Sequence, residues 1–218
     1  RQRKTALDAP LHAVSSGRSM IEMLGVLAII GVLSVGGIAG YSKAMETYKI
    51  NKTKQQIAEI ITNIQTLYMQ QKDFNGLDNT TAVQMGIVPD DLKTSDGEYY
   101  TSITNIFGSP VGIIGYGKSF YINFLNITKE GCIALATADW GNSASGLVAI
   151  NIGFMSGKFD GFLEYYAPKG CTDLGHRDGY GFRACANHLP LSPALAAQHC
   201  DTNSDWGYDN SFGIKFSK

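Results

Sequence analysis

Glu22 lies at the edge of a long apolar run, where a carboxylate is costly to desolvate. From Met23 to Tyr41 the sequence has no ionisable side chain except the Tyr41 phenol. At mid-bilayer a carboxylate costs about 2.5 to 3.5 kcal/mol on insertion scales, and less near the interface. Glu22 therefore needs a partner, unless it reaches the interface as a charge at a helix end can.

Four cysteines, all in the C-terminal half, are the second group with chemical potential: Cys132, Cys171, Cys185 and Cys200. They contain no C-x-x-C pair. An even set beyond an apolar segment favours disulfides formed in an oxidising compartment. Four cysteines allow three connectivities, and their positions alone do not choose among them.

Two metal sites are alternative interpretations. Cys185-x-x-His188 with His199-Cys200 offers four nitrogen and sulfur ligands for tetrahedral zinc. An oxidising compartment argues against this zinc site, because it oxidises thiols.

The second alternative is a calcium loop. Asp201-x-Asn203-x-Asp205 resembles its start, but it lacks the glycine after Asp205 and has Phe212 where the closing acidic residue belongs. An Asx-rich turn is the favoured interpretation.

Composition excludes several classes of protein. The chain has 218 residues, 44% hydrophobic residues and a formal net charge of −1, which fits one globular domain with an attached segment. Neither a disordered polymer nor a nucleic-acid-binding polycation is expected. The sequence has no Gly-x-Ser-x-Gly and no phosphate-binding glycine loop, so we do not expect an enzyme.

The apolar run from Met23 to Tyr41 is long enough to cross a membrane. Its 19 residues would extend roughly 28 Å as a helix, close to the hydrocarbon thickness of a bilayer. Arg1, Arg3 and Lys4 precede it, so the positive-inside rule predicts a cytoplasmic start and places the cysteines outside. The run offers only weak small-x-small cleavage sites, so we expect it to be retained.

After Tyr41 the apolar pattern narrows to one helical stripe. We predict one helix over residues 18–72, ended by residues 73–76, because no proline interrupts it. The stripe comprises Ile50, Ile57, Ile61, Ile64 and Tyr68, and the solvent face comprises Lys49, Lys52, Lys54, Gln55, Gln56 and Glu59.

The rest of the chain predicts an antiparallel sheet. Residues 77–108 suggest a loop with one short helix near 80–85. Alternation at 120–125 after a glycine-rich turn at 115–118 indicates a hairpin. We further predict a helix at 130–139 that carries Cys132, and strands at 147–152 and 211–216. A long helix that feeds an antiparallel sheet is an α+β fold.

The sequence around Glu22 resembles the type IV prepilin signature. It runs Gly17-Arg18-Ser19-Met20-Ile21-Glu22-Met23-Leu24 and continues into the apolar run. That family has a short basic leader, a glycine before the scissile bond, a glutamate five residues after it and a long apolar helix. The resemblance is specific over residues 1–45. The segment from Cys132 to Gly141 and the strand after Cys200 look like the heads of the type IVb subgroup.

The resemblance implies a pilin fold: a long hydrophobic N-terminal helix packed on an antiparallel sheet. It divides the chain into a cleaved leader (1–17), a transmembrane and filament-core helix (18–45) and a globular head (46–218). It also implies cleavage by prepilin peptidase between Gly17 and Arg18. The new α-amine of Arg18, which the family N-methylates, would pair with Glu22 of the next subunit. Such a buried pair fixes register more than it adds stability.

The implied function is that of a structural subunit. It starts in the bacterial inner membrane, meets an assembly platform there, and polymerises into a homo-oligomeric helical filament at the cell surface, with no cofactor. The type IVb resemblance also suggests a Cys132–Cys200 disulfide, with Cys171–Cys185 closing a local loop.

Two departures and two rival functions accompany the resemblance. Arg18 stands where the family usually has an apolar residue. Many relatives have a proline near Ala39, where this chain has Gly36, Gly37 and Gly40, which suit either local melting or close helix contact. The rival functions are a pseudopilin of a type II secretion-like system and a single-pass anchored binding or enzymatic domain; gene neighbourhood and dependence on prepilin peptidase would discriminate them.

Overall fold

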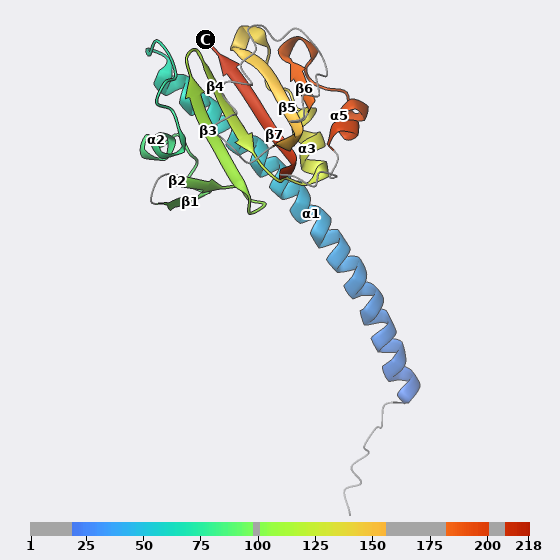
Figure 1. Ribbon diagram of the computed structural model, residues 1–218. Helices are drawn as coiled ribbons and strands as arrows, with labels where there is room; N and C mark the ends of the chain where they lie inside the picture. Colours follow the sequence, from blue (N-terminus) through green and yellow to red (C-terminus); the bar gives the residue numbers. More distant parts are fainter. Residues whose placement is uncertain (1–18, 98–100, 156–181, 201–207) are drawn as a thin grey trace, which may run out of the picture. The chain divides into compact units, whose positions relative to one another are not determined.

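The structure is a computed structural model that describes residues 19–97, 101–155, 182–200 and 208–218 (Figure 1). The chain forms two compact units, Arg1–Met45 and Glu46–Lys218. The first contains the N-terminal part of helix α1, and the second contains the rest of α1 and the sheet.

Helix α1 runs without interruption from Met20 to Tyr68. The predicted single helix is therefore confirmed, although it ends four residues before the expected position. At its C-terminus Gln71 N donates a hydrogen bond to Tyr68 O. The Lys218 ammonium donates to Tyr68 O and Gln71 O, so a lysine satisfies carbonyls that a helix end leaves open.

Seven strands form a single sheet within the described residues, in the order β1-β2-β3-β4-β7-β5-β6 (Figure 1). All neighbouring strands are antiparallel. Strand β7 comes last in the sequence but lies between β4 and β5. The bounds are Lys93–Asp96 (β1), Thr101–Thr104 (β2), Pro110–Tyr116 (β3), Ser119–Phe124 (β4), Leu147–Met155 (β5), Phe182–Cys185 (β6) and Tyr208–Ser217 (β7).

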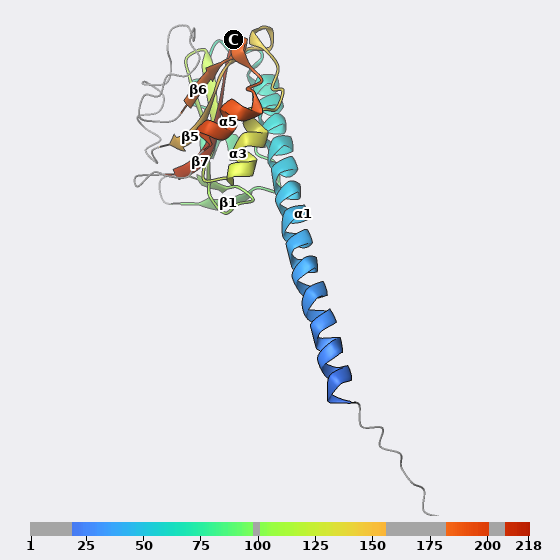
Figure 2. The ribbon, with the colours of Figure 1, turned by 90° about the vertical axis from the view of Figure 1, so that its right-hand side faces the viewer.

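The core lies between this sheet and residues 46–68 of α1, which run along one face (Figure 2). The helix contributes Ile57, Ile60, Ile61, Ile64 and Tyr68, and the strands contribute alternate residues such as Phe120, Ile122, Phe212, Ile214 and Phe216. The period of 3.6 on the helix and of 2 on the strands brings these two apolar surfaces together.

Short helices complete the head. They are α2 (Asn79–Gln84), α3 (Lys129–Ala136), α5 (Pro193–His199) and the 3₁₀ turns η1 (Ser143–Ser145) and η3 (Ala186–His188). Side-chain oxygens cap the α-helices: Asp78 Oδ1 accepts from Thr81 N at 2.7 Å, and Ser192 Oγ accepts from Leu195 N at 3.3 Å. Such caps satisfy the first amides of a helix and fix where it starts.

The opposite face of the sheet carries buried polar residues. Tyr121, Asn123, Asn151 and Lys215 are each less than 10% exposed, and they alternate with the core residues of β4, β5 and β7. Burial lowers the pKa of the Lys215 ammonium, and the charge of Arg183 lowers it further.

The predicted α+β class, the hairpin, the Cys132 helix and both later strands are confirmed. The prediction of a loop with one helix over residues 77–108 is wrong in part, because β1 and β2 lie within it. These strands have four residues each, and all four of β1 are exposed, so no apolar alternation marks β1. Gln56, expected in solvent, is buried, and its Nε2 donates to Asp91 Oδ1 at 3.0 Å. Strand β6 and helix α5 were not predicted.

Candidate functional site: the N-terminal helix and its attachment

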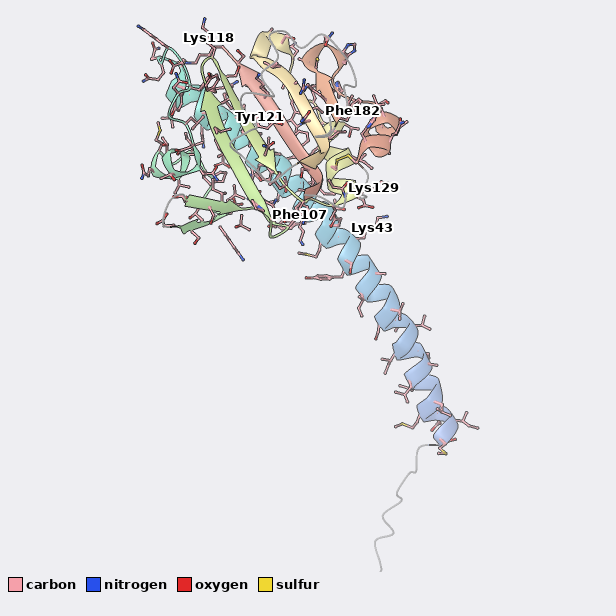
Figure 3. All side chains as sticks on the ribbon, viewed as in Figure 1. Lys43, Phe107, Lys118, Tyr121, Lys129 and Phe182 are labelled. Atoms are coloured by element: carbon pink, nitrogen blue, oxygen red, sulfur yellow. A yellow bond between two sulfur atoms is a disulfide. The ribbon has the colours of Figure 1, made fainter. Side chains whose placement is uncertain are left out.

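Residues 20–44 of α1 expose every apolar side chain they carry. The large ones are between 49% and 85% exposed: Met20, Ile21, Met23, Leu24, Val26, Leu27, Ile29, Ile30, Val32, Leu33, Val35 and Ile38. Figure 3 shows side chains projecting from this part of the helix on all sides. An apolar surface of this extent is not stable in water and indicates a membrane or another protein as its surroundings.

Length and composition agree with membrane insertion. Among the described residues, α1 is the helix long and apolar enough to cross a bilayer, with a mean hydropathy of 2.2 over its best 18-residue window. Gly36, Gly37 and Gly40 have no atom within 4 Å of an added Cβ. The open space around these glycines is compatible with both interpretations of the cluster, local melting of the helix and close contact with another helix.

Glu22 sits in the first turn of α1, where its carboxylate reaches back to the amide of Ser19, as the glutamate of a capping box does. Ser19 N donates to Glu22 Oε2 at 3.2 Å, and Ile21 N donates to Ser19 Oγ at 3.3 Å. This interaction was not predicted from the sequence, although Ser-x-x-Glu is a known N-terminal pattern. Gly17 and Arg18 lie outside the described residues, so the cleavage site stays a prediction.

Contacts near the start of the head attach α1 to loops and to helix α3. The Thr128 hydroxyl, which also caps α3, donates to the Glu46 carboxylate. The Lys49 ammonium lies 5.5 Å from the centre of the Phe107 ring, and Figure 3 labels Phe107 on the head. These contacts use polar and charged residues of α1 that the amphipathic pattern leaves outside the core stripe.

An ion pair continues the attachment one turn further along. Lys52 Nζ pairs with the Asp91 carboxylate, which also accepts from Gln56. Burial raises the pKa of the Asp91 carboxyl, but the hydrogen bonds from Lys52 and Gln56 outweigh it, so the pKa is lowered overall. The hydrogen bond to Asp91 raises the pKa of Lys52. Both shifts favour the charged pair.

The face of α1 that points away from the core has a distinct composition in the head. We call it the outer stripe: Tyr48, Asn51, Gln55, Ala58, Thr62 and Gln65, all exposed. These positions recur at spacings of three and four, so they share one helix face. Their side chains carry no charge, although the exposed Glu59, four residues after Gln55 and three before Thr62, lies beside them on the same face. The stripe is therefore easier to desolvate than a helix surface with many charges.

A disulfide joins Cys132 of α3 to Cys200, the residue that caps the end of α5. Their Cα atoms are 5.8 Å apart. This is the pair that the sequence resemblance suggested. Cys185 is also disulfide-bonded, whereas its expected partner Cys171 lies outside the described residues, so that pairing stays a prediction.

The zinc hypothesis is wrong, because Cys185 and Cys200 are both disulfide-bonded. His199 stacks on Phe182 with ring centres 3.8 Å apart. The calcium hypothesis for Asp201, Asn203 and Asp205 falls outside the described residues. Among those that the structure describes, no group of three or more His, Cys, Asp or Glu side chains could hold a metal ion.

Comparison with known protein families identifies the family of this chain. A family model described as "PilS N terminal" matches residues 47–161, just over half of the chain. The chain therefore belongs to the PilS N-terminal family, and with it to the type IV pilin superfamily.

Individual relatives carry related descriptions. The "Major structural subunit of bundle-forming pilus" of Escherichia coli O127:H6 (strain E2348/69 / EPEC) is 28% identical over 134 residues, covering 60% of this chain and 68% of that protein. The subunit of the same description from Escherichia coli O111:H- gives the same values. The crystal structure of a type IV b pilin from Salmonella typhi superposes with a TM-score of 0.48 at 12% identity, over 75% of this chain and 97% of that one.

Proposed function

We propose that this chain is a structural subunit of a type IVb-like pilus that polymerises through α1 into a surface filament. The observation that carries the proposal is the apolar stretch of α1, exposed along its whole length, that continues into the core helix of a disulfide-bonded head. The relatives described as major structural subunits of a bundle-forming pilus support it.

Helix α1 can serve both the membrane-inserted subunit and the assembled filament. Before assembly, residues 20–44 bury their side chains in the inner membrane, and afterwards they bury them against α1 of other subunits. Lipid tails and apolar side chains are similar solvents for leucine or isoleucine, so the transfer is close to neutral in hydrophobic free energy. Packing and polar interactions between subunits then favour the filament.

Glu22 is the polar residue that this exchange uses. Cleavage by prepilin peptidase between Gly17 and Arg18 creates an α-amine, which pairs with Glu22 of a neighbouring subunit. A charge pair in an apolar filament core has few alternative partners, so it selects one stagger between helices. The family's N-methylation would fall on Arg18, and an inner-membrane platform would drive the extraction.

The head supplies the rest of the contact surface. Contacts of Glu46, Lys52 and Gln56 attach residues 46–68 of α1 to the rest of the head. The uncharged outer stripe faces neighbouring subunits, where a row of lysines or glutamates would be costly to desolvate. The oxidised cysteines suit a head that lies outside the cell.

The test is to purify surface filaments and to sequence the N-terminus of their main subunit by mass spectrometry. We expect this chain to begin at Arg18. Gly17→Val, which places a branched side chain at the scissile bond, should leave uncleaved precursor in the membrane and no filaments. Ser16→Val is the matched control and should be processed normally. Normal cleavage of Gly17→Val, or filaments that lack this chain, would overturn the proposal.

A further inference from the structure

Ser19 and Glu22 form a reciprocal pair across the first turn of α1. We propose that Ser19 is a positioning residue for assembly, which holds the Glu22 carboxylate in the orientation that receives a neighbour's α-amine. This inference rests on the proposed pilus function, since it concerns the same carboxylate.

The geometry is a variant of the capping box, here called the box, in which the Ser19 hydroxyl accepts from the second helical amide, Ile21 N, rather than from the third, Glu22 N. Ser19 precedes the helix, and its hydroxyl oxygen accepts from Ile21 N at 3.3 Å. Glu22 reaches back and accepts from Ser19 N at 3.2 Å through Oε2, while Met23 N donates to Ser19 O at 3.2 Å. Three bonds therefore converge on one residue and fix both the helix start and the direction of the glutamate side chain.

The box leaves Glu22 able to bind a second group. A carboxylate has about four lone-pair positions on two oxygens, and the Ser19 amide uses one of them on Oε2. An ammonium can therefore approach Oε1 while the box stays closed. A side chain already held in one rotamer loses less entropy when it binds than one that rotates freely.

In an apolar environment the bonds between Ser19 and Glu22 contribute more to the stability of the helix start. A helix leaves its first amides without partners, and an unpaired amide is costly wherever the bilayer or the filament core excludes water. The bond between Ser19 N and Glu22 satisfies a donor and an acceptor at once, before any neighbour arrives. Cleavage after Gly17 leaves both residues in the chain, so the same box persists from the membrane-inserted subunit to the filament.

Substitutions at Ser19 separate the hydroxyl from the size of the side chain. Ser19→Thr keeps the capping oxygen, whereas Ser19→Val introduces nearly the same shape without it, so the two variants form a matched pair. Loss of an N-cap typically weakens a helix start about fivefold. At matched subunit levels, and with cleavage confirmed, Ser19→Val should give about fivefold fewer filaments and Ser19→Thr wild-type numbers within about twofold.

A second measurement tests the contact itself in the full chain in lipid nanodiscs. Glu22→Ala should accelerate amide hydrogen exchange at Ser19 about fivefold, the same factor expected for a lost cap, whereas Glu59→Ala should leave it unchanged. The inference is overturned if Ser19→Val assembles as well as Ser19→Thr, or if Glu22→Ala does not change exchange at Ser19. Absence of filaments from the wild type would instead overturn the proposed function, and the nanodisc experiment would still decide whether Ser19 holds Glu22.

Discussion

At the scale of single residues, the pair of Lys52 and Asp91 shows how α1 is held to the head. The lowered pKa of Asp91 means that the folded state binds the proton less tightly than the unfolded chain does. Its stabilising contribution is therefore fully present above the unfolded value of about 3.9. It is lost as the pH falls through the lower, folded-state pKa.

We predict that Asp91→Asn lowers the free energy of unfolding at about pH 6 and that the difference from wild type shrinks progressively as the pH falls below the unfolded value of about 3.9 and through the lower, folded-state pKa. Urea unfolding of the full chain in detergent micelles at a series of pH values measures this. The neighbouring Asp90 is exposed, and Asp90→Asn is the control. A difference between Asp91→Asn and wild type that stays constant across this pH range would contradict the assignment.

Residue-level prediction from sequence succeeded where the signal was local. Glu22 was recognised from its spacing to Gly17 and from the apolar run. Its bond to Ser19 could also have been found, because both residues lie in one Ser-x-x-Glu pattern. The hydrogen bond of Gln56 could not, because its partner Asp91 is 35 residues away in sequence.

At the scale of elements, the turn after α1 packs directly on strand β3 at Gly115. A Cβ at this position would overlap the Phe74 carbonyl oxygen and crowd the Leu77 side chain. The strand cannot easily move aside, because Gly115 N donates to Leu77 O at 2.8 Å. Only the absence of a side chain allows this close approach of two backbone segments.

Gly115→Ala should therefore lower the free energy of unfolding by about 1 to 3 kcal/mol, the usual cost of overpacking. Chemical denaturation of the full chain in micelles gives the value. Gly37→Ala is the contrasting variant, since nothing lies within 4 Å of a Cβ there, and it should not destabilise the head. Equal free energies of unfolding for Gly115→Ala and wild type would contradict this prediction, because they would show that the turn after α1 moves aside for the added methyl group.

The disulfide between Cys132 and Cys200 is the covalent link between α3 and α5. The bonded residues are 68 positions apart, and closing a loop of that length is worth roughly 4 kcal/mol in the chain-entropy model. The double variant Cys132→Ala with Cys200→Ala should unfold at markedly lower denaturant concentration.

Disulfide mapping of the wild type without reduction should also recover a Cys171–Cys185 peptide. Free thiols at those positions would contradict the second pairing.

Elements with a strong periodic pattern were predictable, and short ones were not. The helix stripe and the alternation at Phe120, Ile122 and Phe124 report burial against a single core. Strands β1 and β6 have four residues each at the edges of the sheet. Their pairing is set by neighbours distant in sequence, which no local pattern records.

At the scale of the whole molecule, the division into an apolar helix and a disulfide-bonded head was predictable from the sequence, but the order of the strands in the sheet was not. Charge distribution and cysteine placement separated an apolar helix from an oxidised head. The insertion of β7 between β4 and β5 brings the end of the chain to the centre of the sheet. Its apolar alternation predicts a strand there but does not say which strands it pairs with.

The central claim is that the chain polymerises through α1, with Glu22 as the residue that sets the stagger. Glu22→Ala makes the helix more apolar, so membrane insertion and cleavage should be preserved. Glu59→Ala, which removes an exposed glutamate from the same helix within the head, is the matched control.

The decisive measurement is the number of surface filaments per cell by electron microscopy, at matched subunit levels and with cleavage confirmed by mass spectrometry. The account predicts rare or absent filaments for Glu22→Ala and wild-type numbers for Glu59→Ala. Wild-type numbers of filaments in Glu22→Ala cells would contradict it, because a carboxylate that merely reaches the membrane interface is not needed for assembly.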